Sequence, residues 1–296
     1  MSSTWDNGHD IRIFGLGTLS GSRLKHPEFA EPRVQSDPAL HNPIDIVGAA
    51  NTTVEGITIA DAAHHSLMLI TGYSSSKTTD VRWVKILNWR INGDGINPFG
   101  NGLLEDCFIR TQDDCLYVSG RGIRRIVLWN DFNGSSFVLS SLPQLTDRTL
   151  VVEDCDVIYS RASWHKWSGG RVFNMRGEGK GDCGAGVIFR NINIEDQRPT
   201  LQQFFINMTI PKPYSNEAET RGKGNCANIV FENIAIAAPS VVSEPQILWG
   251  AENARIQNLV FKNLTVGGKA ITEASFFKTN AFVENLVFES TAKDVK

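Results

Sequence analysis

Three aspartates in two short segments have the type and spacing needed for acid–base chemistry. Asp94 lies in INGDGINPFG, and Asp113 and Asp114 lie in TQDDC, where no apolar pattern makes any of them a core residue. Carboxylates that lie close together cannot all ionise without cost, so at least one should keep its proton to unusually high pH. A protonated acid beside an ionised carboxylate is what glycoside hydrolysis requires. Calcium binding and ordinary turn or surface charge stay open alternatives, because Asp-Gly and Asn-Gly also form turns.

A repeated phrase elsewhere in the chain indicates which elements would position these aspartates. The phrase is clearest in VIFRNINIED (187–196), IVFENIAIAA (229–238) and LVFKNLTVGG (259–268). With weaker copies, the apolar residue after the Asn-like position recurs at Ile57, Ile86, Cys107, Phe132, Cys155, Ile192, Ile234, Leu264 and Thr291. Because the segments lack helical i, i+3, i+4 spacing, they predict an all-β fold, a right-handed parallel β-helix (solenoid) of about nine to eleven coils. We expect one domain over residues 1–296, insertions at 160–185 and 197–225, and Asn-like positions stacked as a ladder.

The phase of the repeat brings the aspartates to one patch. Asp94 follows Ile86 by eight residues, and Asp113 and Asp114 follow Cys107 by six and seven. Neighbouring coils stack about 4.8 Å apart, so the three side chains should lie side by side on the same sheet.

The phrases that carry the aspartates resemble those of a known group of enzymes. The nineteen residues from Asp94 in NGDGIN to Asp113 in QDDC, together with GLGTLSG at 15–21, resemble the polygalacturonase-related β-helix glycosidases. The wording INGDGINPFGN and EDCFIRTQDDC is most similar to glycoside hydrolase family 49, the dextranase and isopullulanase family, and the likeness covers most of residues 10–170. The resemblance implies that Asp113 is the general acid, that Asp94 and Asp114 act as general base on water, and that the reaction inverts the anomeric carbon.

The same resemblance carries further expectations. It implies secretion and an N-terminal β-sandwich, for which the chain has no room before GLGTLSG. We expect no cofactor and no metal. A carboxylate separation of about 5 Å would ordinarily indicate a retaining enzyme. The polygalacturonase-like enzymes invert despite close aspartates, so we expect inversion.

Two departures from the pectin-cleaving branch favour a neutral substrate. The Gly-His-Gly turn is absent, with Ser135 or Ser136 about where its histidine is expected, and the Arg-Ile-Lys phrase has no evident counterpart. Galacturonate would need fixed cations there, whereas a glucan would not. The sequence therefore predicts an endo-dextranase first and a pullulan-cleaving enzyme second. A polygalacturonase-like hydrolase, a calcium-dependent lyase and a non-catalytic carbohydrate-binding β-helix stay open.

Several side chains near the aspartates are candidates for binding sugar. Asn92 and Gln112 could orient the carboxylates or bind hydroxyls, and Tyr117 could wall a subsite. The segment ASWHKWSGG supplies Trp164, His165 and Lys166, and His65 is expected one coil before Asp94. A core or loop role is the competing reading for each aromatic residue.

Composition and cysteine spacing limit the remaining classes. A net charge of −3, with 29 basic and 32 acidic residues, gives no electrostatic reason for a nucleic acid or an anionic membrane as partner. The expected partner is a polysaccharide, and a monomer is expected. Cys183 and Cys226 share a phase on adjacent coils and could form a disulfide, whereas no cysteine spacing indicates zinc.

Overall fold

The computed structural model describes residues 9–21, 42–70, 78–90, 92–97, 101–131, 134–140, 149–160, 171–176, 186–197, 224–237, 246–250, 252 and 254–290. In these residues the regular structure is β-strand, apart from the single 3-10 turn η1 (Ala274–Phe276). No helix in the described part of the chain is long and apolar enough to cross a membrane.

The strands form one large sheet and three small ones. The large sheet contains β1 (Arg12–Phe14), β2 (Thr18–Ser20), β4 (Thr52–Glu55), β5 (Thr58–Ala60), β7 (Thr79–Arg82), β8 (Lys85–Leu87), β9 (Leu103–Glu105), β10 (Phe108–Thr111), β12 (Gly122–Arg124), β13 (Val127–Asn130), β15 (Leu150–Ser160), β17 (Val187–Gln197), β18 (Cys226–Ile236), β20 (Ile256–Lys262), β21 (Thr265–Val266), β22 (Lys269–Ala270) and β24 (Val283–Glu289). The small sheets contain β11 (Leu116–Tyr117) with β14 (Phe137–Ser140) and β16 (Phe173–Arg176), β3 (Ile44–Val47) with β6 (Leu67–Ile70), and β19 (Gln246–Ile247) with β23 (Phe277–Lys278).

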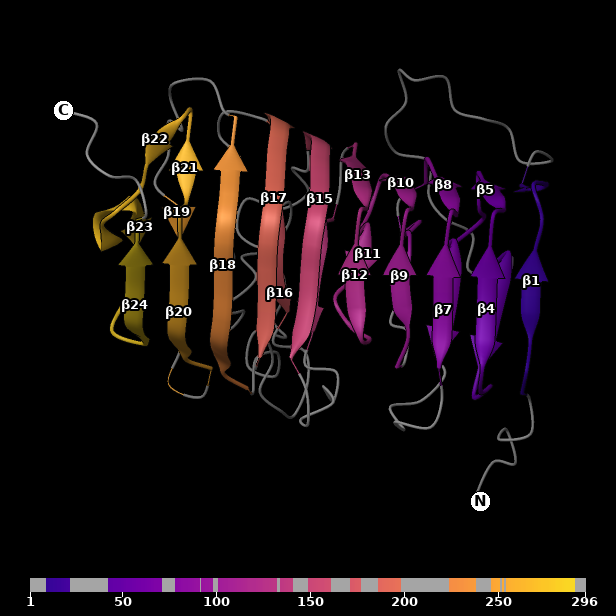
Figure 1. The fold of residues 1–296 in the computed structure, drawn as a ribbon, viewed down its shortest axis with the longest axis horizontal. Coiled ribbons are helices and arrows are strands. Elements are labelled where there is room, and N and C mark those ends of the chain that lie inside the picture. The colour runs from indigo at the N-terminus through magenta and orange to yellow at the C-terminus, as the bar shows by residue number, and fades with distance from the viewer. Residues whose placement is uncertain are drawn as a thin grey trace, which may run out of the picture.

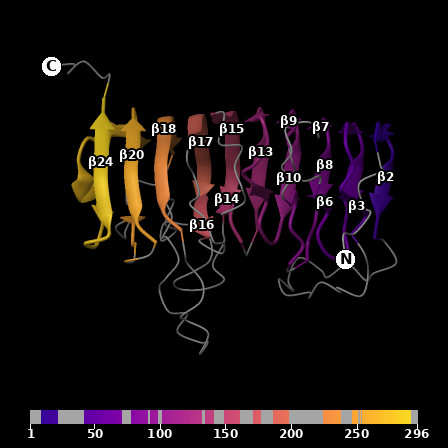
Figure 2. The same cartoon turned by 90° about the horizontal axis from the view of Figure 1, so that it is seen from below.

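The pairing is that of a solenoid. Strands β15, β17, β18, β20 and β24 pair in parallel in that order, while β21 and β22 form an antiparallel pair. Figure 1 shows the strands lying side by side in chain order, from β1 at the indigo end to β24 at the yellow end. The view from below, in Figure 2, shows the same succession on a second face. The predicted right-handed parallel β-helix is therefore confirmed.

A ladder of left-handed residues turns the chain in each coil. Asn263 Nδ2 donates to Asn233 Oδ1, and Asn233 Nδ2 donates to Asn191 Oδ1, both at 2.9 Å. All three residues have positive φ, and Asn191 continues the ladder to Asp154. Asparagine tolerates this conformation better than most residues because its short polar side chain can bond locally. The stacking that the repeat predicted is present.

Two of the predicted repeat positions are wrong. Thr58 pairs with Lys85, and Lys85 with Phe108, so Val84 rather than Ile86 is equivalent to Ile57 and Cys107. Likewise Phe108 pairs with Val127, so Ile126 rather than Phe132 is equivalent to Cys107 in the next coil. Phe132 itself lies outside the described residues. The left-handed position before each marker is filled here by Trp83 (φ 55°) and Arg125 (φ 54°). A pattern that looks for Asn or Asp misses both.

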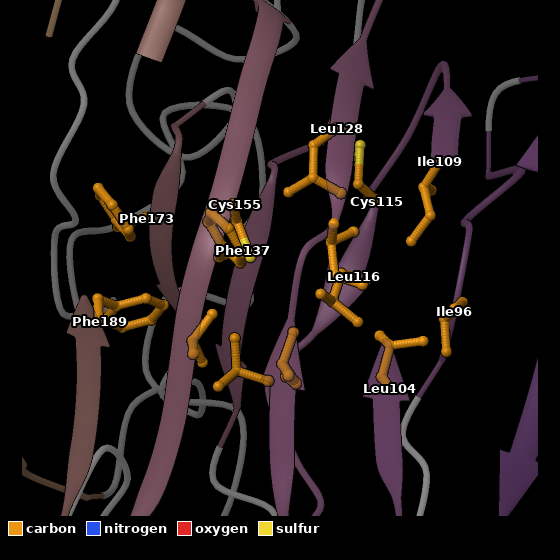
Figure 3. Close-up of a cluster of buried hydrophobic side chains, with 14 of the residues drawn as sticks. Ile96, Leu104, Ile109, Cys115, Leu116, Leu128, Phe137, Cys155, Phe173 and Phe189 are labelled. Atoms are coloured by element: carbon orange, nitrogen blue, oxygen red, sulfur yellow. The ribbon is translucent and has the colours of Figure 1, made fainter. Parts of the chain in front are cut away.

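Stacked aromatic and aliphatic side chains fill the interior. Phe189, Phe231 and Phe261 are fully buried at successive rungs, with ring centroids 5.3 and 5.1 Å apart. Figure 3 shows this type of packing around Phe137, Phe173 and Phe189, with Cys155 and Cys115 among the apolar side chains. Burial raises the pKa of the Cys107 and Cys155 thiols to about 12, so both behave as small apolar core residues, as their phase predicted.

The first expected insertion is not wholly an insertion. Strand β16 lies within 160–185 and pairs with β14 through Phe173 and Phe137, so this segment completes a rung of the solenoid. The proposed disulfide stays a prediction, because Cys183 lies outside the described residues; Cys226 is buried at the start of β18.

One outward-facing row of the large sheet alternates in charge. We call it the outer charge row; its register-paired members are Glu55, Arg82, Glu105, Arg124, Glu153, Arg190, Glu232, Lys262 and Glu289. Neighbours in the row form ion pairs, including Arg82–Glu55 at 3.2 Å and Arg190–Glu232 at 2.8 Å.

Candidate active site

The structure brings Asp94, Asp113 and Asp114 into one cluster. One oxygen from each carboxylate lies within 4.8 Å of those of the other two. The residues are only 5%, 3% and 1% exposed, respectively. Ionised carboxylates that are this close and this poorly solvated repel one another strongly. Their roles in catalysis stay predictions.

Asp113 is held in a fixed orientation by backbone amides. The Asn92 N–H donates to Asp113 Oδ2, and the Asp114 N–H donates to Asp113 Oδ1, both at 2.9 Å. Thr111 Oγ1 and Asn130 Nδ2 donate to the Asp113 carbonyl oxygen at 2.6 and 2.8 Å, which anchors the backbone of the turn. Amide donors on both oxygens fix the plane of the carboxyl group and favour its ionised form. The negative charges of Asp94 and Asp114 act in the opposite direction.

The two aspartate-bearing turns differ in length yet end in register. Leu87 pairs with Arg110, and the Gly95 N–H donates to the Asp114 carbonyl oxygen at 2.8 Å, so Asp94 lies beside Asp114. Six residues (88–93) separate the paired positions in the first coil, and three (111–113) in the next. Gly95 permits the close approach, since a Cβ there would lie 2.3 Å from the Cys115 carbonyl oxygen.

The cluster belongs to a longer stack, which we call the Asp94 column. Successive backbone bonds run from Ser66 N to Asp94 O, from Gly95 N to Asp114 O, from Cys115 N to Ser135 O and from Ser136 N to Arg171 O. The column therefore consists, coil by coil, of His65, Asp94, Asp114, Ser135 and Arg171. Two acidic side chains lie between an imidazole and a guanidinium.

Arg171 is a candidate that sequence reasoning missed. It lies two coils beyond Asp114 in the Asp94 column and is 5% exposed, and burial lowers the pKa of its guanidinium to about 10. The phrase GGRVF therefore supplies an arginine where no counterpart of Arg-Ile-Lys was expected. The residue two places later is Phe173, which is buried in the core. Continuing the rung count through 160–185 would have found Arg171.

The predicted sugar-binding residues have different outcomes. Tyr117, on β11, donates its hydroxyl to Asp114 Oδ2 at 3.3 Å, which places it beside the acids. Asn92 acts on Asp113 through its backbone rather than its side chain. Gln112 is buried, and its Oε1 makes no hydrogen bond to any residue that the structure describes. His65 lies next to Asp94, with Nδ1 at 3.4 Å from Oδ2. Trp164, His165 and Lys166 lie outside the described residues.

Two other kinds of chemistry at the cluster are nucleophilic attack by a thiol and cation binding by the carboxylates. Cys115 follows Asp114 directly, but burial raises the pKa of its thiol to about 12, so it stays neutral and is a poor nucleophile. The three clustered carboxylates could also contribute to a divalent-cation site, although calcium generally takes six to eight oxygen ligands.

Comparisons with known proteins agree with the fold and with the family resemblance. The sequence matches no protein-family model. It is 28% identical over 254 residues to probable exopolygalacturonase B from Emericella nidulans, a match that covers 77% of this chain and 53% of that protein. The chain thus spans about half the length of this curated relative.

Two solved structures share the architecture. Dex49A from Penicillium minioluteum superposes with a TM-score of 0.61 at 15% identity, covering 95% of this chain and 50% of that one. A family 28 exopolygalacturonase from Yersinia enterocolitica superposes with a TM-score of 0.53 at 15% identity, and the match covers 97% of this chain and 62% of that one. By fold and by sequence similarity, this chain is related to the polygalacturonase-like β-helix glycosidases.

Proposed function

We propose that this chain hydrolyses glycosidic bonds of a polysaccharide, using Asp94, Asp113 and Asp114. The observation that carries the proposal is the cluster of three buried carboxylates whose oxygens lie within 4.8 Å of one another. A shared proton supplies an acid for the leaving oxygen, and an ionised neighbour supplies a base for water. The similarity to glycosidases of this fold supports the assignment.

The proposed reaction assigns one role to each position. Asp113, whose plane is fixed by two backbone amides, gives its proton to the glycosidic oxygen as the bond breaks. Asp94 or Asp114 takes a proton from the water that attacks the anomeric carbon, and the cluster then returns that proton to Asp113. Because two backbone amides favour the ionised form of Asp113, its acid role depends on repulsion from the two neighbouring carboxylates. We propose inversion, as the resemblance implies, although a short carboxylate separation ordinarily accompanies retention.

A neutral α-glucan is the proposed substrate, with dextran first and pullulan second. Ser135 lies in the Asp94 column, and Ser135 or Ser136 is about where the histidine of the pectin branch is expected. Phe173, two residues after Arg171, stands where a second cation would be needed. Each replacement removes a group suited to an anionic sugar. The fold similarity to Dex49A agrees with this choice.

Polygalacturonate is the second candidate, and two observations favour it. Arg171 places a guanidinium in the Asp94 column, and guanidinium groups pair with carboxylates through two parallel hydrogen bonds. The curated relative is described as an exopolygalacturonase.

The test is product analysis on dextran, pullulan and polygalacturonate, with the anomeric form of the first product followed by NMR. We expect α-glucan cleavage with inversion, and a loss of about 10²- to 10⁴-fold in Asp113→Asn. Asp156→Asn is the matched control, because Asp156 lies on the outer face of β15 and its Asn193 partner can also bond an amide. Cleavage of polygalacturonate alone would select the second candidate. Binding of isomaltooligosaccharides without any product would instead indicate a non-catalytic carbohydrate-binding β-helix.

A further inference from the structure

His65 is buried against the first carboxylate of the cluster. Its Nδ1 lies 3.4 Å from Asp94 Oδ2, and the two side chains are 19% and 7% exposed. This nitrogen is inaccessible to solvent, and it makes no hydrogen bond of ordinary geometry with the described residues. A buried polar atom without such a bond is costly, and the carboxylate beside it is its natural acceptor. A sugar in contact with the column cannot readily reach the same nitrogen.

The surrounding residues hold His65 in this place. The N–H of Ser66, the residue after His65, donates to the Asp94 carbonyl oxygen at 2.8 Å. This bond joins the coil of His65 to the coil of Asp94. Buried Asn88 donates through Nδ2 to the His64 carbonyl oxygen at 2.9 Å and to Ser66 Oγ at 3.1 Å. One amide therefore bonds the backbone of the residue before His65 and the side-chain hydroxyl of the residue after it.

The neutral ring of His64 packs against the His65 imidazole. The two rings lie 3.7 Å apart between centroids. Burial, followed by repulsion from His65, lowers the pKa of His64, so His64 is neutral at neutral pH. Its own Nδ1 lies beside Asn42 Oδ1 at 3.3 Å, away from Asp94.

We propose that His65 is a positioning residue for Asp94, donating Nδ1–H to Asp94 Oδ2 so that Oδ1 is aimed at the attacking water. The proposal rests on the proposed glycoside hydrolase function. No proton is transferred by His65: the water proton goes to the carboxylate, and the imidazole keeps its own. A distance of 3.4 Å is long for this bond, but such contacts commonly shorten when substrate closes the site.

The kinetic test compares three substitutions at one position. His65→Ala should lower kcat about 10- to 100-fold, while KM changes less than about twofold, because the lost interaction aligns the base. His65→Asn, whose amide nitrogen can occupy the place of Nδ1, should recover most of that loss. His65→Gln, whose amide extends to the place of Nε2, should not. Thermal unfolding midpoints within a few degrees of wild type would show that all three proteins fold.

The opposite kinetic pattern would overturn the proposal. A raised KM with unchanged kcat would make His65 a sugar contact, and equal recovery by His65→Asn and His65→Gln would exclude a specific role for Nδ1.

A spectroscopic test separates this proposal from the proposed function. Long-range ¹H–¹⁵N NMR of the imidazoles should show a protonated Nδ1 for His65 in the wild type. In Asp94→Ala that signature should revert to the Nε2–H tautomer. If no polymer is cleaved, the hydrolase assignment fails while this result still reports on the contact. If His65 Nδ1 is unprotonated in an active wild type, the positioning role is wrong and the hydrolase assignment stands.

Discussion

At the scale of single residues, Gly134 creates the space in which the paired aspartates turn. Its φ is +70°, and a Cβ at this position would lie 2.2 Å from the Asp114 nitrogen and 2.3 Å from the Asp113 carbonyl carbon. Any other residue here would strain the left-handed backbone, and its Cβ would collide with the turn that carries Asp113 and Asp114. The candidate site thus depends on a residue that contributes no functional group.

We expect Gly134→Ala to lower both stability and hydrolysis. The matched control is Gly268→Ala, because Gly268 has a similar φ of +76° but nothing within 4 Å of its Cβ position. Gly268→Ala should cost about 1–2 kcal/mol from backbone conformation alone. Gly134→Ala should cost clearly more in urea unfolding and should reduce kcat, since the turn carrying Asp113 must move. Equal losses of stability with unchanged kcat would contradict this account.

At the scale of secondary structure elements, the asparagine ladder fixes where each strand bends. Asn233 both accepts from Asn263 and donates to Asn191, and its φ is 55°. The same side chain therefore makes the left-handed turn tolerable and joins three coils. On an exposed edge each of these bonds contributes modestly, about 0.5–1.5 kcal/mol.

Two substitutions at Asn233 should separate these contributions. Asn233→Ala loses both ladder bonds and strains the backbone, so we expect about 1–3 kcal/mol of destabilisation. Asn233→Gly also loses the two ladder bonds, but glycine adopts a positive φ without strain, so this variant should be less destabilised than Asn233→Ala. Chemical denaturation of both proteins checks the order. A glycine variant no more stable than the alanine variant would show that φ is not the limiting feature.

The outer charge row links the elements through their outward faces. Exposed ion pairs contribute little individually. Their alternation matters more for the choice of neighbour, because skipping one coil would set two like charges opposite one another at that junction. Glu105 shows the local effect: a hydrogen bond from Arg124 Nε at 2.7 Å lowers the pKa of the Glu105 carboxyl.

The dependence of unfolding free energy on acidic pH should reveal the contribution of the Arg124–Glu105 pair. Because the folded-state pKa of Glu105 lies below its unfolded value near 4.5, its stabilising effect is present above that pH. The effect is lost as pH falls through the folded-state pKa. We expect Arg124→Gln to flatten the decline of unfolding free energy below about pH 4.5. Chemical denaturation at a series of pH values, at low and high salt, measures this difference. If the unfolding free energy declines with pH equally steeply in wild type and Arg124→Gln, the Arg124–Glu105 pair does not contribute.

At the scale of the whole molecule, each coil of the solenoid packs mainly on its two neighbours. The phenylalanine stack makes this visible, since Phe231 touches Phe189 on one side and Phe261 on the other. Stability in such a fold is approximately a sum of coil terms and nearest-neighbour interfaces. Damage in one coil should therefore spread only locally before global unfolding.

Phe231→Ala should demonstrate this locality. Loss of a fully buried phenylalanine should cost about 3–5 kcal/mol. Hydrogen exchange should show reduced protection in β17, β18 and β20, with little change in β4 and β7. Phe14→Ala is the control, because Phe14 on β1 is 64% exposed and should change stability by less than about 0.5 kcal/mol. A uniform loss of protection in Phe231→Ala would show that the solenoid unfolds as one unit.

The sequence alone determined the class of fold and the identity of the acids. Strand-period alternation and the recurring asparagines identified the β-helix, because those features are local and repeat along the chain. The segments NGDGIN and QDDC brought the three aspartates to adjacent coils even though the assumed marker Ile86 was two residues out of register. That error arose because Trp83 adopts the left-handed turn conformation without the residue type that normally indicates it, and Arg125 caused the corresponding error at Phe132.

Only the tertiary structure decided which groups surround the acids. It placed Arg171 in the Asp94 column, placed His65 Nδ1 3.4 Å from Asp94 Oδ2, and supplied the Asn92 and Asp114 amides to Asp113. Spacing had placed His65 one coil before Asp94, but it gave neither the atom that faces the carboxylate nor the amide bonds to Asp113, because turns of unequal length join the strands, as residues 88–93 and 111–113 show. Alternation with a period of two fixes which face a strand residue occupies, whereas the length of each turn sets which residues from successive coils meet.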